Sequence, residues 1–341
     1  MGLKTEEFDY PLPKEFIAQH PETDRACSRL LVLHRNDGSM EHRRFGDIVE
    51  FLKAGDVIVI NDTKVLPARL KGRKPTGGAL DILLVEKIDG GRWSCLVDGA
   101  KKGSGALDAV IGDVPVRLER EGQFWRIDFL GASADEVMVR HGVMPLPHYI
   151  RRGENGGGSL DEERYQTIYA EKLGSIAAPT AGLHFTEGLL DRIRQVGVTV
   201  LKITLHIGVG TFFLVKTEQV EEHRMHREYY KVEPELTARL RDAKARGGRV
   251  FAVGTSATRT LETLFSQNGN GSHEGYTELF IHPGYAFKAV DGLISNFHLP
   301  RSTPLLLVCA FAGRENTFEA YRQAMALNYR FYSYGDAMLV L

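Results

Sequence analysis

Histidines recur in this sequence where short apolar runs give way to polar or glycine-containing turns. His184 follows the run from Ser175 to Ala178, and His206 ends the run that starts at Val198. Imidazole takes up or releases a proton near neutral pH, so several such side chains could together do acid–base chemistry. One histidine of this kind more often only hydrogen-bonds a neighbouring loop. The repetition of the pattern is what predicts a site.

Acidic and glycine residues occupy similar turns. Asp62 follows the apolar stretch that ends at Ile60, and Gly208, Gly210 and Thr211 follow His206 closely. In the stretch 174–186, backbone N–H groups of the turn and the start of the following helix favour an anionic group of a ligand. The sequence therefore predicts that a ligand with an anionic group binds near His184.

A metal site is the alternative for one segment. In His223-x-x-His226-x-Glu228, two imidazoles three residues apart could share one face of a helix. The arginines and tyrosines of the same segment suit a solvated or RNA-facing surface equally well, and we expect no bound metal. The sequence also lacks a P-loop, a complete dinucleotide fingerprint, a G-x-S-x-G elbow and an H-E-x-x-H pair.

The 341 residues include 43 Lys and Arg against 44 Asp and Glu, a formal net charge of −1. This balance excludes a global basic field, so any nucleic-acid surface must be local. Arg69, Lys71, Arg73 and Lys74 could form such a surface, or only a solvated face. Three widely spaced cysteines, and no apolar run near the ~20 residues that span a bilayer, predict a cytoplasmic protein without a membrane partner.

Two kinds of segment must position these residues. In 1–65 and 148–341, apolar runs that end in polar or glycine turns alternate with helical patterns. This alternation is typical of a mostly parallel α/β domain, which binds ligands at the carboxyl ends of its strands. In 66–147, short alternating stretches separated by glycine turns predict an inserted small all-β, barrel-like domain.

The stretch GSIAAPTAGLHFT (174–186) is expected to be the main corner of the α/β sheet. Its apolar start, Ser175 to Ala178, predicts a buried strand, which Pro179 ends. Thr186 is expected to cap a helix that closes by Gly197. His184 would then lie at the carboxyl end of a sheet strand.

Longer motifs resemble one family over nearly the whole chain. They are FDYPLP (8–13), NDTKVLPARL (61–70), ERYQT (163–167), AAPTAGLHFT (177–186), LHIGVGTF (205–212), HRMHREYY (223–230), HPGYAFKAVDGLISNFHLPRSTPLL (282–306) and YRFYSYGDAML (329–339). In these motifs the sequence is similar to the S-adenosylmethionine:tRNA ribosyltransferase-isomerase family of queuosine biosynthesis. The resemblance implies an α/β domain with an inserted β-barrel.

The resemblance also implies an unusual reaction. The ribosyl part of S-adenosylmethionine would be transferred to the aminomethyl group of 7-aminomethyl-7-deazaguanine, already present at the wobble position of a tRNA. Adenine and methionine would leave, and the product base would be epoxyqueuosine. S-adenosylmethionine is then a consumed substrate, and no cofactor or metal is implied.

Under this resemblance, site residues can be assigned as hypotheses. The acid–base candidates are His184, His206 and His298, and Asp62 would orient one of them. Backbone N–H groups would receive the methionine carboxylate or a ribose hydroxyl at Thr180, Gly208, Gly210 and Thr211. Aromatic stacking on adenine or the target base is assigned to Tyr285 and Phe297. Polar contacts to tRNA or donor are assigned to Arg164, Gln166, Arg259 and Asn296.

Two rival functions are considered. An S-adenosylmethionine methyltransferase would normally show a glycine fingerprint after its first strand, which is missing here. A barrel-type RNA-binding module would explain the basic strand at 69–74 but not the repeated histidine-bearing turns. The sequence shows no coiled-coil heptads, and we expect a monomer.

Overall fold

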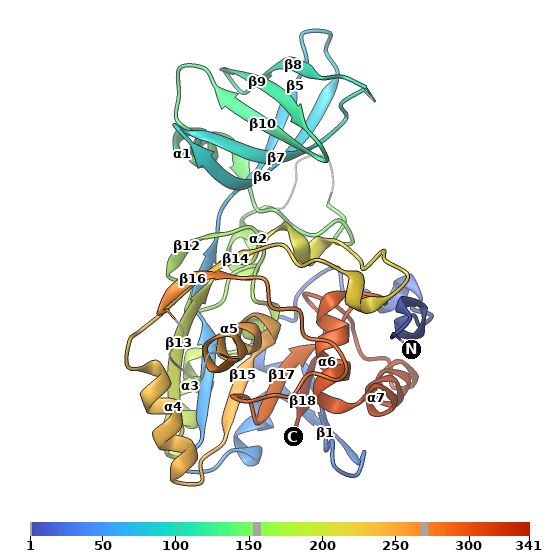
Figure 1. The fold of residues 1–341 in the computed structure, drawn as a ribbon, viewed down its shortest axis with the longest axis vertical. Coiled ribbons are helices and arrows are strands. Elements are labelled where there is room, and N and C mark those ends of the chain that lie inside the picture. The colour runs from blue at the N-terminus through green and yellow to red at the C-terminus, as the bar shows by residue number, and fades with distance from the viewer. Residues whose placement is uncertain (1, 102, 153–157, 267–271) are drawn as a thin grey trace. The chain divides into compact units, whose positions relative to one another are not determined.

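The computed structural model describes residues 2–101, 103–152, 158–266 and 272–341. Two compact units make up the chain (Figure 1). The first comprises Met1–Lys64, Gln166–Lys172 and Ala178–Leu341, and the second comprises Val65–Tyr165 and Leu173–Ala177. Each unit contains a sheet of its own.

The described part of the first unit is built on a mixed sheet of nine strands, in the order β16-β14-β13-β3-β15-β17-β18-β1-β2. Its central strands β13, β3, β15 and β17 run parallel, and β14 and β16 continue it as an antiparallel edge. The strands are β1 (Arg29–Leu33), β2 (Met40–Arg44), β3 (Val57–Asn61), β13 (Thr199–Leu205), β14 (Glu228–Val232), β15 (Val250–Val253), β16 (Glu274–Thr277), β17 (Gly292–Asn296) and β18 (Ala337–Val340).

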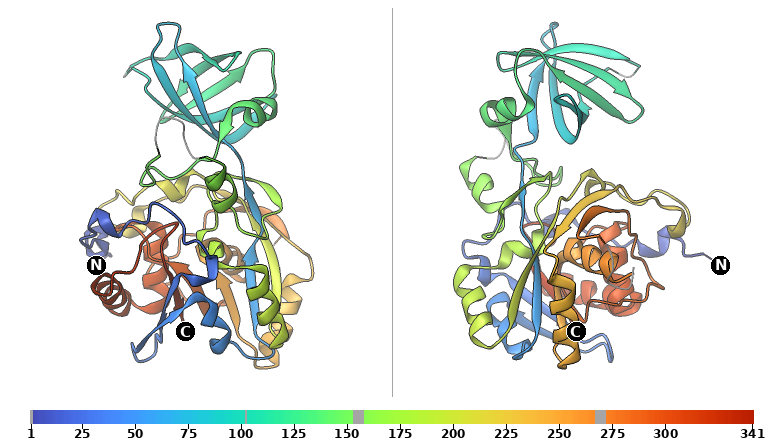
Figure 2. Two further views of the ribbon diagram at one scale, coloured as in Figure 1. Left: turned by 180° about the vertical axis from the view of Figure 1, so that it is seen from behind. Right: turned by 60° about the vertical axis from the view of Figure 1, so that its left-hand side comes forward.

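Helices cover both faces of the sheet centre. On one face, Leu189 and Ile193 of α3 (Glu187–Gln195) join a buried cluster with Ile58 and Ile60 of β3. Figure 1 shows the other face, covered by α5 (Gly254–Ser266), α6 (Thr303–Ala312) and α7 (Arg314–Ala326), and Figure 2 shows α3 from behind. Because both faces are covered, β3 is buried along its whole length, as is usual for a central parallel strand.

Strand β14, next to the edge strand β16, is covered on one face only. Its side chains alternate, with Glu228, Tyr230 and Val232 buried and with Tyr229 and Lys231 more exposed. Successive strand residues point to opposite faces, so the sheet here presents one open face. This open face lies on the same side of the sheet as α3, because Lys231 pairs with Thr204, which shares a face of β13 with Val200, and Val200 packs against the cluster that contains Leu189 of α3.

The corner at 174–186 is only partly as predicted. The helix start at Thr186 is confirmed, since its Oγ1 accepts a hydrogen bond from Leu189 N–H at 3.1 Å. The strand expected at 175–178 is wrong: β12 spans Lys172–Ser175 and pairs with β4 (Thr63–Val65), outside the nine-stranded sheet. The Ser175 hydroxyl donates to the Ala177 carbonyl at 2.7 Å, a local bond that competes with strand pairing. His184 instead ends a short 3-10 helix, η5 (Thr180–His184).

The second unit contains a closed antiparallel barrel. The strands follow the order β5-β6-β7-β10-β9-β8, and β8 pairs back onto β5 at Gly72 and Ile111. The strands are β5 (Arg69–Arg73), β6 (Ala79–Asp89), β7 (Arg92–Asp98), β8 (Ala106–Ile111), β9 (Val114–Glu121) and β10 (Phe124–Phe129). The same unit contains β11 (Gly142–Val143), α1 (Ala134–His141) and α2 (Ser159–Arg164). The predicted fold class, an α/β domain with a small β-barrel, is confirmed.

The basic strand of the barrel is partly neutralised. Asp81 on β6 accepts hydrogen bonds from Arg69 at 2.8 Å and from Lys71 at 2.6 Å. Sequence spacing could not show this, because the acid comes from the neighbouring strand. Among the described residues, no helix is both long and apolar enough to cross a membrane.

Candidate active site

A pocket of the first unit brings together His206 and Asp62. Its volume is ≈ 540 Å³, and it lies along β13 and β14, where Thr204 and Tyr229 contribute to its lining. Charged side chains of both signs line the rest of it: Glu171, Lys172, Lys202, Lys231, Glu233, Glu235 and Arg239. The pocket therefore combines a carboxyl group, an imidazole and an aromatic ring with a rim of mixed charge.

His206 is half-buried at the end of β13. Its Nδ1 lies 2.8 Å from the Thr63 hydroxyl, and its ring stacks on Tyr229 with centroids 5.6 Å apart. Burial lowers the pKa of His206, so the imidazole is neutral at pH 7. In the tautomer with the proton on Nδ1, that N–H donates to Thr63 and Nε2 has a lone pair with which to accept a proton.

Asp62 is buried beside His206, with an exposed fraction of 5%. One carboxyl oxygen accepts a hydrogen bond from the Thr204 hydroxyl at 2.6 Å. Burial raises the pKa of Asp62, and the Thr204 bond opposes that shift only in part. The hydrogen bond from Thr204 therefore offsets only part of the cost of burying the charged Asp62 carboxylate. A cationic or hydrogen-bond-donating ligand would stabilise the charged form further.

The buried Asn61 side chain joins the turns that carry these two residues. Its Oδ1 accepts from the N–H groups of Leu205 and Thr63, at 3.0 and 3.2 Å, and its Nδ2 donates to the Leu205 carbonyl at 3.0 Å. Asn61 thus fixes the end of β3 against the end of β13. Sequence reasoning missed Asn61, Thr63 and Thr204, although Asn61 and Thr63 flank Asp62 in the NDTK turn.

The glycine turn after His206 rests on a buried ion pair. Glu228 accepts a hydrogen bond from Gly208 N–H at 2.8 Å and forms a short ion pair with Arg259 of α5. Arg259 also donates to the Leu279 carbonyl at 2.9 Å. Since protein groups surround the Arg259 guanidinium, its observed role is to hold this turn. Gly210 packs close to His226, where an added Cβ would lie 3.2 Å from the ring, and Thr211 follows in a short 3-10 helix, η6 (Val209–Phe212).

His184 is enclosed, with an exposed fraction of 4%. Its Nε2 accepts from Asn296 Nδ2 at 3.0 Å, so the proton lies on Nδ1, which bonds the Ser28 hydroxyl at 2.7 Å. Burial and the nearby arginine charges lower the pKa of His184 to about 3. Both ring nitrogens are already used inside the protein. The predicted base therefore acts in this structure as a link between η5, β17 and the segment at Ser28.

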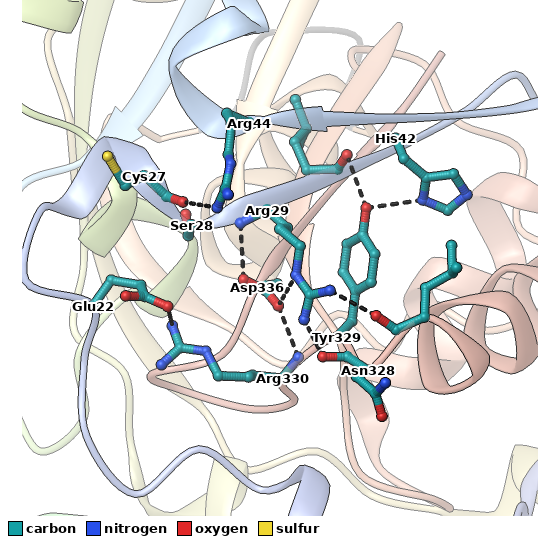
Figure 3. A network of polar contacts seen from close by, with 12 residues as sticks. Glu22, Cys27, Ser28, Arg29, His42, Arg44, Asn328, Tyr329, Arg330 and Asp336 are labelled. Carbon is teal, nitrogen blue, oxygen red and sulfur yellow. Dashed lines mark hydrogen bonds and ion pairs between the residues drawn. The ribbon is translucent and has the colours of Figure 1, made fainter.

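The loop before β18 surrounds this link. Asp336 accepts from the N–H groups of Arg29 and Arg330 at 2.8 and 2.7 Å and pairs with the Arg29 guanidinium (Figure 3). The same guanidinium lies 4.3 Å from the centre of the Tyr329 ring. Asn296 in turn reaches the carbonyl groups of Tyr332 and Asp336, each at 3.4 Å. The conspicuous YRFYSYGD motif is thus tied to His184 through Asn296.

His298 and Phe297 belong to the opposite face of the sheet. His298 Nε2 bonds the Ser295 hydroxyl at 2.7 Å, and burial lowers its pKa to about 3. The Phe297 ring is fully buried and packs against Tyr321 and Phe331, with centroids 5.2 and 4.9 Å away. The assignment of Phe297 to ligand stacking is therefore corrected, because both faces of a core ring are occupied by other side chains.

Four further candidates are not among the residues that line the pocket. Tyr285 donates its hydroxyl to Glu262 at 3.2 Å, and Glu262, fully buried, also accepts from three backbone N–H groups at 288–290. Thr180 begins η5 and is half-buried, as is Gln166. Arg164 belongs to the second unit, at the end of α2. None of these four lines the pocket of His206.

The structure therefore separates the three predicted histidines. His184 and His206 share one face and the carboxyl end of the central strands, but β17 and β13 are three strand spacings apart, about 14 Å. His298 lies on the other face, since Ser295 and Asn296 are consecutive residues of β17. Only His206 shares the pocket with Asp62. Within the described ranges, no group of three or more His, Cys, Asp or Glu side chains could hold a metal ion.

Comparison with known proteins shows where this chain belongs. A family model described as "Queuosine biosynthesis protein" matches residues 5–340. The chain is a member of the queuosine biosynthesis protein family. Among the family's curated members, proteins named S-adenosylmethionine:tRNA ribosyltransferase-isomerase from Pelotomaculum thermopropionicum and Symbiobacterium thermophilum are each 48% identical, over 99% of this chain and 100% of their own length.

A solved member of the family has the same fold. The crystal structure of an S-adenosylmethionine tRNA ribosyltransferase from Thermotoga maritima matches with a TM-score of 0.56 and 37% identity, and covers 98% of this chain and 100% of its own. The family resemblance found in the sequence motifs is confirmed. It extends over both units, because the matched residues run almost from end to end.

Proposed function

We propose that this chain is an S-adenosylmethionine:tRNA ribosyltransferase-isomerase of queuosine biosynthesis. It transfers the ribosyl group of the donor to the aminomethyl group of 7-aminomethyl-7-deazaguanine at the tRNA wobble position. A C–N bond forms at the amine, which loses one proton, while adenine and methionine leave and the ribosyl carbons become the epoxide-bearing ring of epoxyqueuosine. The observation that carries the proposal is full-length membership of a family whose curated relatives have this name.

The pocket of His206 and Asp62 is the proposed reaction site. The donor's sulfonium acidifies the ribose C5′ protons next to it, and a neutral imidazole can remove one of them. His206 supplies that base through Nε2, with Thr63 holding Nδ1. Asp62, buried and only partly compensated, stabilises the sulfonium and accepts a hydrogen bond from the ribose.

Several finer features belong to the same proposal. Cys27 is exposed and Cys95 and Cys309 are buried, all as free thiols, which supports a reducing, cytoplasmic setting. We propose a monomer that binds tRNA and S-adenosylmethionine and needs no metal or added cofactor. The donor is consumed in each turnover.

The test is an assay with donor labelled separately in its methyl and ribose carbons, together with wobble-modified tRNA. Ribose label in the RNA, with release of one adenine per transfer, supports the proposal, whereas methyl label in the RNA supports a methyltransferase. Absence of both labels, with RNA still bound, supports an RNA-binding module.

Variants of the same assay test the site. His206→Gln and Asp62→Asn should each lower kcat about 10²–10⁴-fold, the usual contribution of a general base. His20→Gln, at an exposed histidine, is the matched control and should keep wild-type activity. Wild-type turnover by His206→Gln would remove this residue from the reaction.

A further inference from the structure

His206 is the first of three rings in one row across the open edge of the sheet. Leu205 pairs with Tyr230, so the next antiparallel pair brings His206 opposite Tyr229. The backbone N–H of His206 donates to the Tyr229 carbonyl at 2.9 Å. Tyr229 is in turn the direct partner of Tyr276 on β16. Directly paired residues of antiparallel strands present their side chains on the same face. The three rings therefore line one face, from the pocket toward the sheet edge.

The rings contact one another in sequence. His206 stacks on Tyr229 at 5.6 Å with an interplanar angle of 24°, and Tyr229 meets Tyr276 edge-on at 5.8 Å and 71°. The Arg227 guanidinium lies 4.8 Å from the centre of the Tyr276 ring. We call His206, Tyr229 and Tyr276 the ring row. The ring row begins in the pocket at His206 and ends at Tyr276, next to the Arg227 guanidinium.

The opposite face of the same strands is closed. Glu228, Tyr230 and Thr277 are buried there, and Thr263 of α5 bonds the Thr277 hydroxyl at 2.6 Å. Tyr276, by contrast, is 56% exposed. Tyr276 therefore lies outside the core, and its ring has exposed area on which a planar group can stack.

The charges around the ring row indicate what kind of partner fits. Lys231 pairs with Glu274 at 2.8 Å and Lys202 with Glu171 at 3.2 Å, so these lysines are largely compensated. Because positive and negative charges alternate here, the surface has no strong positive potential that would attract a polyanion. A ligand that binds here must gain its affinity mainly by stacking on the rings. Flat, uncharged nucleobases stack on aromatic and guanidinium planes, which is how single-stranded RNA is usually bound.

We propose that the ring row is a stacking platform for an unpaired base of the anticodon loop, next to the base that is modified in the pocket. The platform base stacks on Tyr276, with Arg227 beside it in reach of the adjoining phosphate. Tyr229 separates the platform from His206, so the flanking base and the reacting base occupy adjacent positions on the sheet. The RNA partner rests on the proposed function, whereas the stacking itself can be tested by binding alone.

The test uses the full chain and an anticodon stem-loop RNA that carries the modified wobble base. Two versions place the fluorescent base 2-aminopurine on the 5′ or the 3′ side of that base. Binding should quench one of them, and Tyr276→Leu, which keeps apolar area but removes the ring, should abolish the quenching. Tyr276→Phe is the matched control and should quench as wild type does.

Affinity provides a second, independent readout. Tyr276→Leu should weaken RNA binding about 5- to 150-fold, the equivalent of the ~1–3 kcal/mol of one base stack. The factor should be the same at 50 and 200 mM salt, because stacking releases no counterions, whereas Arg227→Gln should reduce the salt slope by about one. The affinity for free S-adenosylmethionine should not change.

Two results would overturn the platform: wild-type quenching and affinity in Tyr276→Leu, or a loss of donor affinity in place of RNA affinity. Failure of the proposed function has a different signature. In that case wild-type protein would bind and quench the stem-loop but would transfer no ribose label, and the platform would still stand on its binding data.

Discussion

At the scale of single residues, His184 and His206 show how one residue type serves two purposes. His184 has both ring nitrogens bonded inside the protein, to Asn296 and Ser28. The His206 ring bonds the Thr63 hydroxyl through Nδ1 and lines a pocket. Burial lowers the pKa of both, so the pKa direction alone does not distinguish a structural from a catalytic imidazole.

The enclosure of His184 predicts a pH-dependent stability. Its pKa is about 3 in the folded protein against an ordinary value of 6.5, so the unfolded chain binds more protons between these values. Stability is therefore complete above pH 6.5 and falls as the pH drops toward 3, by up to about 1.4 kcal/mol per pH unit for this residue. Urea unfolding of wild type and His184→Asn at several pH values measures the difference in slope.

His20→Gln, at an exposed histidine, is the control for the effect of removing an imidazole from the surface. His298, whose pKa is also about 3, contributes its own share, so the slope of His184→Asn should be reduced and not abolished. Equal slopes in wild type and His184→Asn would contradict the buried, neutral state.

Thr63 is predicted to be a positioning residue for His206. Thr63→Val removes the partner of Nδ1, which frees the ring to rotate and to change tautomer, and kcat should fall about tenfold for a lost hydrogen bond of ~1 kcal/mol or slightly more. Thr63→Ser keeps the hydroxyl and should restore the rate. A steady-state comparison with KM unchanged supports the role, whereas equal loss in both variants would point to a packing defect.

At the scale of elements, η5 is held by close packing around one glycine. An added Cβ on Gly182 would lie 2.2 Å from the Tyr169 hydroxyl and 2.7 Å from Thr167. That hydroxyl is buried and has no hydrogen-bond partner among the described residues. The position of η5, and with it His184, therefore depends on a small residue at 182 and not on a polar contact from Tyr169.

This packing predicts a non-additive pair of substitutions. Gly182→Ala should destabilise the fold by about 1–3 kcal/mol through overpacking. Tyr169→Phe alone should change stability by less than about 1 kcal/mol, because the hydroxyl it removes is already unsatisfied. The double variant should recover part of the loss, measured as the coupling energy in a denaturation cycle. Strict additivity would mean that the clash is relieved elsewhere.

At the scale of the whole molecule, each unit has its own buried core. Ile82 and Val116 are fully buried in the barrel, and Ile58 and Phe251 are fully buried in the nine-stranded sheet. Units with separate cores can unfold as separate cooperative transitions. The division of the chain is therefore open to a thermodynamic test.

We predict two transitions in calorimetry. Ile82→Ala should lower the midpoint of one transition and Phe251→Ala that of the other, each by several degrees for a loss of about 2–5 kcal/mol. Each substitution should leave the second midpoint nearly unchanged. A single transition that both variants lower together would mean that the units unfold as one.

The sequence by itself determined the family and the fold class. Long motifs such as HRMHREYY are specific, and the change from apolar runs to short alternating stretches near residue 66 marks where barrel strands begin. The spacing of the residues also predicted that glycine and histidine occur in turns. These features depend on residues that are close together in the sequence, so they can be recognised from the sequence alone.

Only the tertiary structure decided which of those residues lie together. Strand order separates β13 from β17, so His206 joins Asp62 while His184 is enclosed by Asn296 and Ser28. Register aligns His206 with Tyr229 and Tyr276, which are 23 and 70 residues away in the chain. Strand order and register depend on pairing between segments that are far apart in the sequence and on which face of each strand is buried. The residue spacing within a single segment does not determine either of them.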